Sequence, residues 1–256
     1  MARRMKIAAW MLLLGLPIVA RGNVLINGGL ETSLTATQPD DLVYASPSMN
    51  SNALPGWTIT SGTVDIVPNS YFQAAQGNFS VDLIGTPGIG SIAQTFATTP
   101  GDLYRLTFEF SVTPENKSKE KNTTKVLQVE ALGANGSSVL ASQTWQDTVG
   151  TRTRTNMEYQ QKTFTFTADG TSATLTLAAL APLNLPAGIT AATAYCGPVV
   201  DGLDLEDTGS GQPPAPEPAS LGIVGAGAIL LVVRRGNTKH EIQNTKHKTR
   251  NMKHET

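Results

Sequence analysis

Hydrophobic and polar residues alternate along most of the middle of the chain. The clearest run is Leu103–Val112, where every second residue from Tyr104 onward is apolar and the residues between, Arg105 to Ser111, are polar or charged. Successive side chains of a β-strand point to opposite faces, so this period of two predicts a strand with one face on a core and the other toward solvent. Strands of this kind are typical of antiparallel sheets.

Further segments are predicted to be strands, and turn residues separate them. They are Thr58–Val67, Phe79–Ile84, Ser91–Phe96, Val126–Leu132, Ser138–Trp145, Gln161–Ala168, Ala173–Leu180 and Pro198–Leu205. The breaks between them are rich in Gly, Pro and Asn, as in Gly85–Gly90 and Gly133–Gly136. No stretch of a dozen residues between 23 and 208 has a convincing helical period. The pattern therefore predicts one all-β sandwich domain over residues 23–208.

The N-terminal residues have the pattern of a secretory signal peptide. Basic residues at positions 3, 4 and 6 precede the apolar stretch Ile7–Leu16, and small residues end at Ala20. This order predicts a signal peptide over residues 1–20, which signal peptidase removes after Ala20 on the general secretory route.

A second apolar segment follows the predicted domain. A Pro- and Gly-rich linker, 209–218, ends in Pro216-Glu217-Pro218, and the run Leu221–Val233 is then followed by Arg234 and Arg235. Residues 219–233 form 15 residues, roughly 22 Å as a helix against a hydrocarbon core of about 30 Å. The segment is therefore short for a stable span and favours a transient insertion, with the arginines on the cytoplasmic side. The alternative is a buried core helix.

Charge and the rarer residue types exclude several functions. Residues 21–233 hold 9 basic and 18 acidic residues, so nucleic acid is not expected as a partner. The single cysteine, Cys196, allows no internal disulfide. The three histidines all lie in a seven-residue repeat over 236–256, which is predicted to be a disordered extension. The domain therefore has no Ser-His-Asp system and no histidine-ligated zinc.

Two resemblances follow from these motifs. Pro216-Glu217-Pro218, the apolar run and Arg234-Arg235 resemble the PEP-CTERM sorting signal, here 216–235, on which an exosortase-type transpeptidase acts. Within residues 23–207, Val24–Glu31, Leu54–Trp57 with Thr63–Ile66, and Gly197–Asp201 resemble blocks of the domain-of-unknown-function family 642 and its choice-of-anchor C relatives.

The family resemblance implies a galactose-binding-like jelly-roll sandwich outside the cell membrane. It implies binding of cell-wall or matrix polysaccharide, and no catalytic residues are established for the family. Together with the predicted signal peptide and sorting signal, it predicts a secreted, envelope or extracellular-matrix location reached through a membrane-inserted precursor. Jelly rolls of this type often hold a structural calcium between their first and last strands, which implies Glu31 and Asp201 as ligands, with Asn27 nearby. The alternative is that these two carboxylates cap or pair at a strand end.

Saccharide recognition needs an aromatic ring for the C–H face of the sugar and polar groups for its hydroxyls. Tyr71, in the loop after Pro68-Asn69, and Trp145, at the end of a predicted strand, are the candidates, and core packing is the alternative for both. An enzyme would have to rely on carboxylates, but the alternation places Asp65, Asp82, Glu109 and Glu130 on solvated faces. We therefore expect a non-catalytic binding protein, with a structural or adhesion role in a matrix as the alternative.

Overall fold

The computed structural model describes residues 22–31, 43–85, 88–114, 122–193 and 197–210. The predicted signal peptide, the linker from residue 211, the sorting signal with its apolar run, the repeat tail and Cys196 lie outside the described residues. In the described part, no helix combines the length and the hydropathy that a membrane crossing requires.

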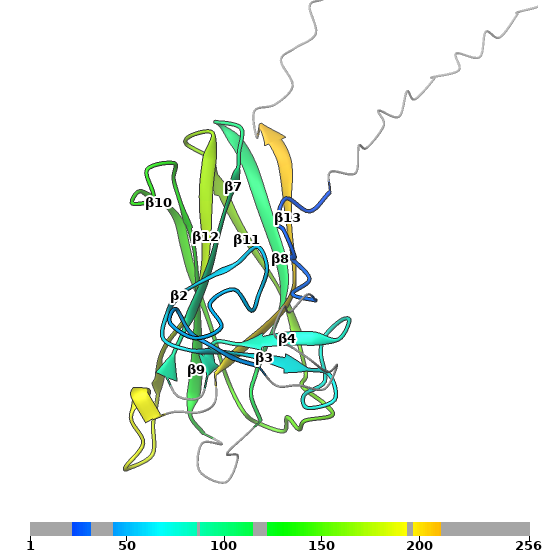
Figure 1. The fold of residues 1–256 in the computed structure, drawn as a ribbon, viewed down its shortest axis with the longest axis vertical. Helices are drawn as coiled ribbons and strands as arrows, with labels where there is room; N and C mark the ends of the chain where they lie inside the picture. Colours follow the sequence, from blue (N-terminus) through cyan, green and yellow to red (C-terminus); the bar gives the residue numbers. More distant parts are fainter. Residues whose placement is uncertain (1–21, 32–42, 86–87, 115–121, 194–196, 211–256) are drawn as a thin grey trace, which may run out of the picture. The chain divides into compact units, whose positions relative to one another are not determined.

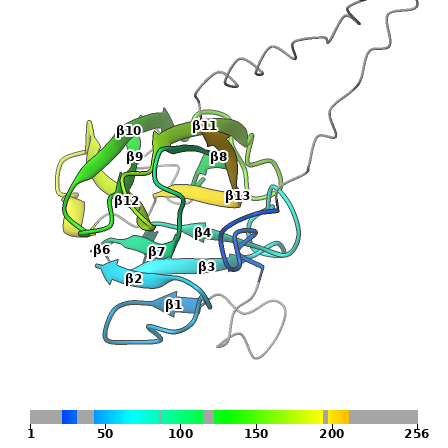
Figure 2. The same cartoon turned by 90° about the horizontal axis from the view of Figure 1, so that it is seen from above.

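Two antiparallel sheets face each other, which confirms the predicted all-β sandwich (Figures 1 and 2). The six-stranded sheet has, in spatial order, β1 (Val43–Ala45), β3 (Val64–Pro68), β4 (Phe79–Asp82), β13 (Pro198–Ser210), β8 (Asp102–Val112) and β11 (Gln160–Thr167). The five-stranded sheet has β10 (Val139–Thr148), β9 (Thr124–Leu132), β12 (Ser172–Leu183), β7 (Ser91–Ala97) and β2 (Thr58–Ser61). A small hairpin, β5 (Ile84–Gly85) with β6 (Gly88–Ile89), and the 3-10 turn η1 (Ala191–Thr193) complete the described elements.

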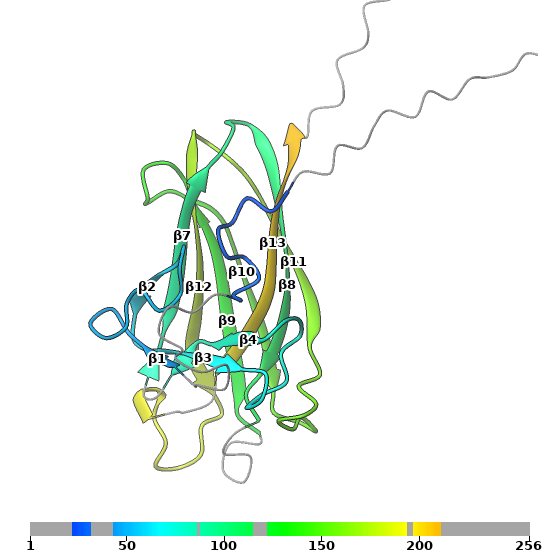
Figure 3. The same cartoon turned by 45° about the vertical axis from the view of Figure 1, so that its right-hand side comes forward.

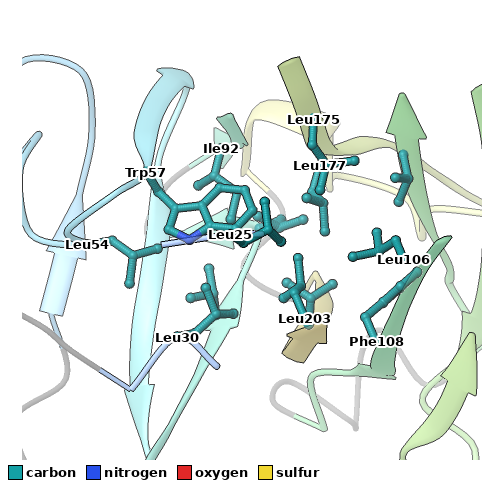
Figure 4. Close-up of a cluster of buried hydrophobic side chains, with 14 of the residues drawn as sticks. Leu25, Leu30, Leu54, Trp57, Ile92, Leu106, Phe108, Leu175, Leu177 and Leu203 are labelled. Carbon is teal, nitrogen blue, oxygen red and sulfur yellow. The ribbon is translucent and has the colours of Figure 1, made fainter. Parts of the chain in front are cut away.

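The core lies between the sheets, and β8 supplies its centre. The apolar residues of the alternating run are all buried, as predicted: Tyr104, Leu106, Phe108, Phe110 and Val112. Leu175 and Leu177 of β12 belong to the same buried cluster (Figure 4). The ring of Tyr104 stacks on Phe166 of β11 with 5.3 Å between centroids. Burial of these large side chains is the main favourable contribution to the stability of such a sandwich.

The prediction of one strand over Thr58–Val67 was wrong. Residues 58–61 form β2 in one sheet, and residues 64–68 form β3 in the other. The chain turns at Gly62, which has a φ of +56°, and a Cβ there would lie 1.8 Å from the carbonyl oxygen of Ile89. A glycine is needed where the backbone adopts a positive φ and another backbone approaches this closely.

The first described segment, 22–31, packs along β13 (Figure 3). The Val24 amide donates to the Leu205 carbonyl at 2.8 Å, and the Leu203 amide donates to the Gly28 carbonyl at 3.0 Å. The indole of Trp57 is 4% exposed and donates to the Asn27 carbonyl at 3.1 Å, which ties the turn before β2 to the same segment. These bonds bring Glu31, at the end of the segment, to the loop between β3 and β4.

Candidate functional site

Two loops meet at one end of the six-stranded sheet. Residues 69–78 connect β3 to β4, and residues 149–159 connect β10 to β11 (Figure 1). The Gln73 amide donates to the Arg154 carbonyl at 2.8 Å, and the Met157 amide donates to Oε1 of Gln73 at 3.3 Å. Gln73 therefore joins the two loops directly.

Two pockets lie beside these loops and share Gln73; we call the pair the loop groove and each pocket one of its halves. One half, of about 320 Å³, is lined by Gln73, Ala74, Ala75, Glu109, Asn156, Glu158 and Tyr159. The other half, of about 400 Å³, is lined by Asn69, Ser70, Tyr71, Gln73, Arg154 and Thr155. Gln73 borders both halves, so a ligand longer than one unit could contact both.

Tyr71, predicted as a ligand contact, lines the second half of the groove and is half-buried. The guanidinium carbon of Arg154 lies 4.2 Å from the centroid of its ring, and Nη2 of Arg154 donates to its hydroxyl at 3.1 Å. Phe72 lies beside it, with 4.8 Å between ring centroids, and is buried in a small second core with Val67, Met157 and Val199. The aromatic ring is therefore held on a packed base.

Trp145, the other predicted contact, does not line either half of the loop groove. It is half-buried on β10, packs against the main core, and meets Phe108 edge to face with 5.3 Å between ring centroids.

The loop over 149–159 is held in place by Arg152, which is 4% exposed. Its Nε donates to Oγ of Ser111 at 3.1 Å and to the Met157 carbonyl at 3.0 Å, and its Nη1 donates to the Thr148 carbonyl at 2.8 Å. Nη2 forms an ion pair with Asp147 at 2.7 Å. This network also buries Ser111, whose place in the alternating run predicted a solvated position. The sequence pattern did not identify Arg152, because nothing local distinguishes it from a surface arginine.

The loop over 69–78 is held by Asp201, which is fully buried on β13. Its Oδ2 accepts from the Ala75 amide at 2.8 Å and from the Gln76 amide at 3.1 Å. Burial raises the pKa of Asp201 to about 7; the backbone hydrogen bonds oppose this rise and the charge of Glu31 adds to it. Glu31 contacts the same loop a little further along, where its Oε2 accepts from the Asn78 amide at 2.7 Å.

The carboxylates of Glu31 and Asp201 have one feature that is expected of ligands to a hard cation such as calcium. Oε1 of Glu31 and Oδ1 of Asp201 are both buried and have no hydrogen-bond partner among the described residues. Gly77 makes room for the Glu31 carboxylate, since a Cβ at that position would lie 2.0 Å from Oε1. Among the described residues, no three or more His, Cys, Asp or Glu side chains lie together so that they could hold a metal ion, so further oxygen ligands would come from the backbone or from water. Asn27 directs its amide nitrogen to the Pro55 carbonyl at 3.2 Å, toward the turn before β2.

Asp65 and Asp82 form a second acidic pair, and both are buried. The prediction from the sequence that these two carboxylates lie on solvated faces was wrong. Asp65 of β3 and Asp82 of β4 are cross-strand neighbours, 6% and 2% exposed. Asp82 accepts from the Ile84 amide at 2.9 Å and from the Thr113 hydroxyl. Burial first, and the charge of Asp65 second, raise the pKa of Asp82 to about 8. Of the other two carboxylates, Glu109 is half-buried and lines the groove, and Glu130 accepts from Gln128 at 2.9 Å.

The fold and the groove define a β-sandwich protein whose candidate site is built by two loops at one end of a sheet. The chain belongs to the family described as "Protein of unknown function (DUF642)", whose model matches residues 23–206.

One curated relative is halomucin of Haloquadratum walsbyi (strain DSM 16790 / HBSQ001). It is 29% identical over 165 residues, which are 62% of this chain, and the chain spans 2% of the length of halomucin.

Solved structures with a similar fold include carbohydrate-binding modules. A family 4 module has a TM-score of 0.37 at 13% identity, covering 72% of this chain and 99% of the module. The module TmCBM61, solved with β-1,4-galactotriose, has a TM-score of 0.37 at 14% identity, covering 72% and 98%. A family 35 module from Clostridium thermocellum has a TM-score of 0.33 at 11% identity, covering 66% and 95%.

Proposed function

We propose that this protein binds a polysaccharide without cleaving it, and that the loop groove is the binding site. The observation that supports this is the convergence of Tyr71, the amides of Asn69 and Gln73, and the carboxylates of Glu109 and Glu158 on one groove. A pyranose offers a C–H face to an aromatic ring and hydroxyls to amides and carboxylates, so this set of side chains suits a sugar.

The position of the acidic groups favours binding over hydrolysis. Two-carboxylate glycoside hydrolysis needs one carboxyl group of raised pKa beside the scissile bond and a second carboxylate near it. Asp82 and Asp201 have buried carboxyl groups with raised pKa values, and neither of them lines the groove. Within the groove, Oε1 of Glu158 accepts from the Thr151 hydroxyl at 2.7 Å.

The proposed setting is the cell envelope or the extracellular matrix. Its support is the sequence: the predicted signal peptide 1–20, the PEP-CTERM-like signal 216–235 and its apolar run 219–233. In this proposal signal peptidase and an exosortase-type transpeptidase process a membrane-inserted precursor. The sandwich is interpreted as a galactose-binding-like jelly roll.

A structural calcium ion is part of the proposal. Glu31 and Asp201 would hold it, since each has a buried carboxylate oxygen with no hydrogen-bond partner among the described residues. The ion would neutralise two carboxylates that accept hydrogen bonds from the backbone of the 69–78 loop, and so stabilise the loop that carries Tyr71.

The test is a glycan array with pull-down from wall and matrix polysaccharides, run with calcium and with chelator. We expect binding to a defined polysaccharide that falls at least tenfold in Tyr71→Ala. Tyr44→Ala is the matched control, because Tyr44 is 40% exposed on β1 and does not line the groove. If both variants bind the polysaccharide as tightly as the parent protein, the binding site lies outside the groove.

The alternative is a structural or adhesion role in a matrix. It would use the hydroxyl-rich outer face of the five-stranded sheet, where the Thr95 and Thr174 hydroxyls lie 2.8 Å apart and Ser142 donates to Glu130 at 3.0 Å. Absence of binding to every glycan, with loss of cell aggregation on deletion of the protein, would favour this role.

A further inference from the structure

A tyrosine belongs to each half of the loop groove. Tyr159 lines the first half, and Tyr71 lines the second. Both are half-buried, and both pack against the small second core around Phe72. From this pairing we propose, resting on the proposed function, that the groove has two saccharide subsites. The protein then recognises a polysaccharide through at least two consecutive pyranose units, one on each tyrosine, and not through a single terminal sugar.

Tyr159 contributes its ring to the first half, not its hydroxyl. The phenol oxygen of Tyr159 is buried and has no hydrogen-bond partner among the described residues. Because that oxygen is inaccessible, the side chain can meet a ligand only through its carbon surface. The C–H face of a pyranose packs on such a surface, so Tyr159 suits a stacked sugar unit.

Hydrogen-bonding groups line the same half as Tyr159. They are the carboxylate of Glu109 on β8 and the side chains of Asn156 and Glu158 in the loop that leads to β11. A carboxylate accepts hydrogen bonds from sugar hydroxyls, and an amide both donates and accepts them. The first half therefore combines a ring with the polar groups that a pyranose needs, and it can hold a sugar unit of its own.

Gln73 fixes the position of one subsite relative to the other. It borders both halves and lies two residues after Tyr71, and its Oε1 accepts from the Met157 amide at 3.3 Å, close to Tyr159 in the chain. The two rings are therefore carried by loops that are bonded to each other before a ligand arrives. A site that is already arranged loses less free energy on binding than one that must be ordered.

This arrangement predicts how affinity depends on the length of the sugar chain. Once one unit is bound, the next unit of the same chain meets the second subsite as an intramolecular event. A well-packed tyrosine contact commonly contributes a factor of about 10 or more in affinity. We therefore expect a gain of at least about 10-fold from one unit to two or three units, and little further gain from three units to four.

The experiment is calorimetric titration of the purified full-length protein. The probes are galactose, glucose, mannose and xylose, and their β-1,4-linked oligomers of two, three and four units. If the glycan array identifies a polysaccharide of another linkage, its partial hydrolysis products of the same lengths replace these series. The quantity measured is the ratio of the affinity for three units to the affinity for one unit.

Two kinds of variant test the first subsite. Tyr159→Leu keeps an apolar contact with the second core but removes the ring, so the length ratio should fall at least about 10-fold, and Tyr159→Phe should recover most of it. Ala75→Trp should lower the ratio without touching the core, because Ala75 is exposed and lines the first half. Ser70→Trp should do the same in the second half. Ser48→Trp is the control, at an exposed position that lines neither half.

The outcomes separate this inference from the proposed function. If no probe and no arrayed glycan binds the parent protein, the proposed function itself fails. If a single sugar binds the parent as tightly as the longer chains, the protein binds sugar but the two-subsite inference is wrong. If the length ratio is high in the parent and stays high in both Tyr159→Leu and Ala75→Trp, the second unit is bound outside the first half, and the role of Tyr159 is refuted.

Discussion

Stability should fall as the pH rises, because Asp82 is buried as an acid. Its pKa is raised from 3.8 to about 8, so between those values the folded protein binds a proton that the unfolded chain releases. Under this condition the free energy of unfolding decreases by about 1.4 kcal/mol per pH unit for one group. From pH 5 to pH 8 the loss due to Asp82 therefore reaches about 4 kcal/mol, and above the folded pKa the curve becomes flat. Asp201, with a pKa raised to about 7, adds a second decline that ends at a lower pH.

Asp82→Asn should remove the larger part of this slope. An asparagine oxygen can still accept from the Ile84 amide, and its NH₂ group can donate to the Thr113 hydroxyl, which is able to accept. At pH 5, where Asp82 is protonated, the variant should be within about 1 kcal/mol of the parent; at pH 8 it should be more stable by about 2–4 kcal/mol. The variant still carries Asp201, whose pKa is raised to about 7, so a smaller slope remains.

The assay is urea denaturation followed by tryptophan fluorescence at pH values from 5 to 9, since Trp57 is 4% exposed and reports on the core. Glu130→Gln serves as the control, because it removes a half-buried carboxylate from the outer face of the five-stranded sheet. A parent stability that rises from pH 5 to pH 8, or an identical slope in Asp82→Asn, would refute the reasoning.

Two further predictions concern the supports of the loop groove. Arg152→Met should destabilise the protein by about 3–5 kcal/mol, because it removes a buried cation that pairs with Asp147 and donates to the Thr148 and Met157 carbonyls. Arg105→Met, at an exposed pair, should cost at most about 1 kcal/mol. Equal losses of unfolding free energy in the two variants would contradict the role of the buried network. Calcium should raise the melting temperature of the parent. At a calcium concentration 100 times the dissociation constant of the site, the stabilisation is about 2.7 kcal/mol. Glu31→Gln should abolish this shift, whereas the control Glu206→Gln should keep it. The absence of any shift at millimolar calcium in differential scanning calorimetry would exclude the ion.

The sequence by itself determined the layered architecture, because burial of one strand face leaves a local signature. The alternation in Leu103–Val112 predicted which residues of β8 face the core, and the structure buries all five of its apolar members. Strand ends were predicted less well: Gly62 divides one predicted strand into β2 and β3, and β1, with three residues, was too short to show a pattern.

Only the tertiary structure decided which polar residues are buried and which line the groove. The outward-facing Asp65 and Asp82 are buried because distant backbone lies against them: a Cβ on Gly85 would be 2.8 Å from Asp65, and one on Gly197 would be 2.2 Å from Asp82. The two arginines of residues 151–155 also show that the local sequence does not determine which polar residues are buried. Arg152 is buried by Ser111 and Asp147, while Arg154, two residues later, stacks on Tyr71 and lines the groove. Their local sequences are nearly identical, and contacts from strands and loops far along the chain give them different roles.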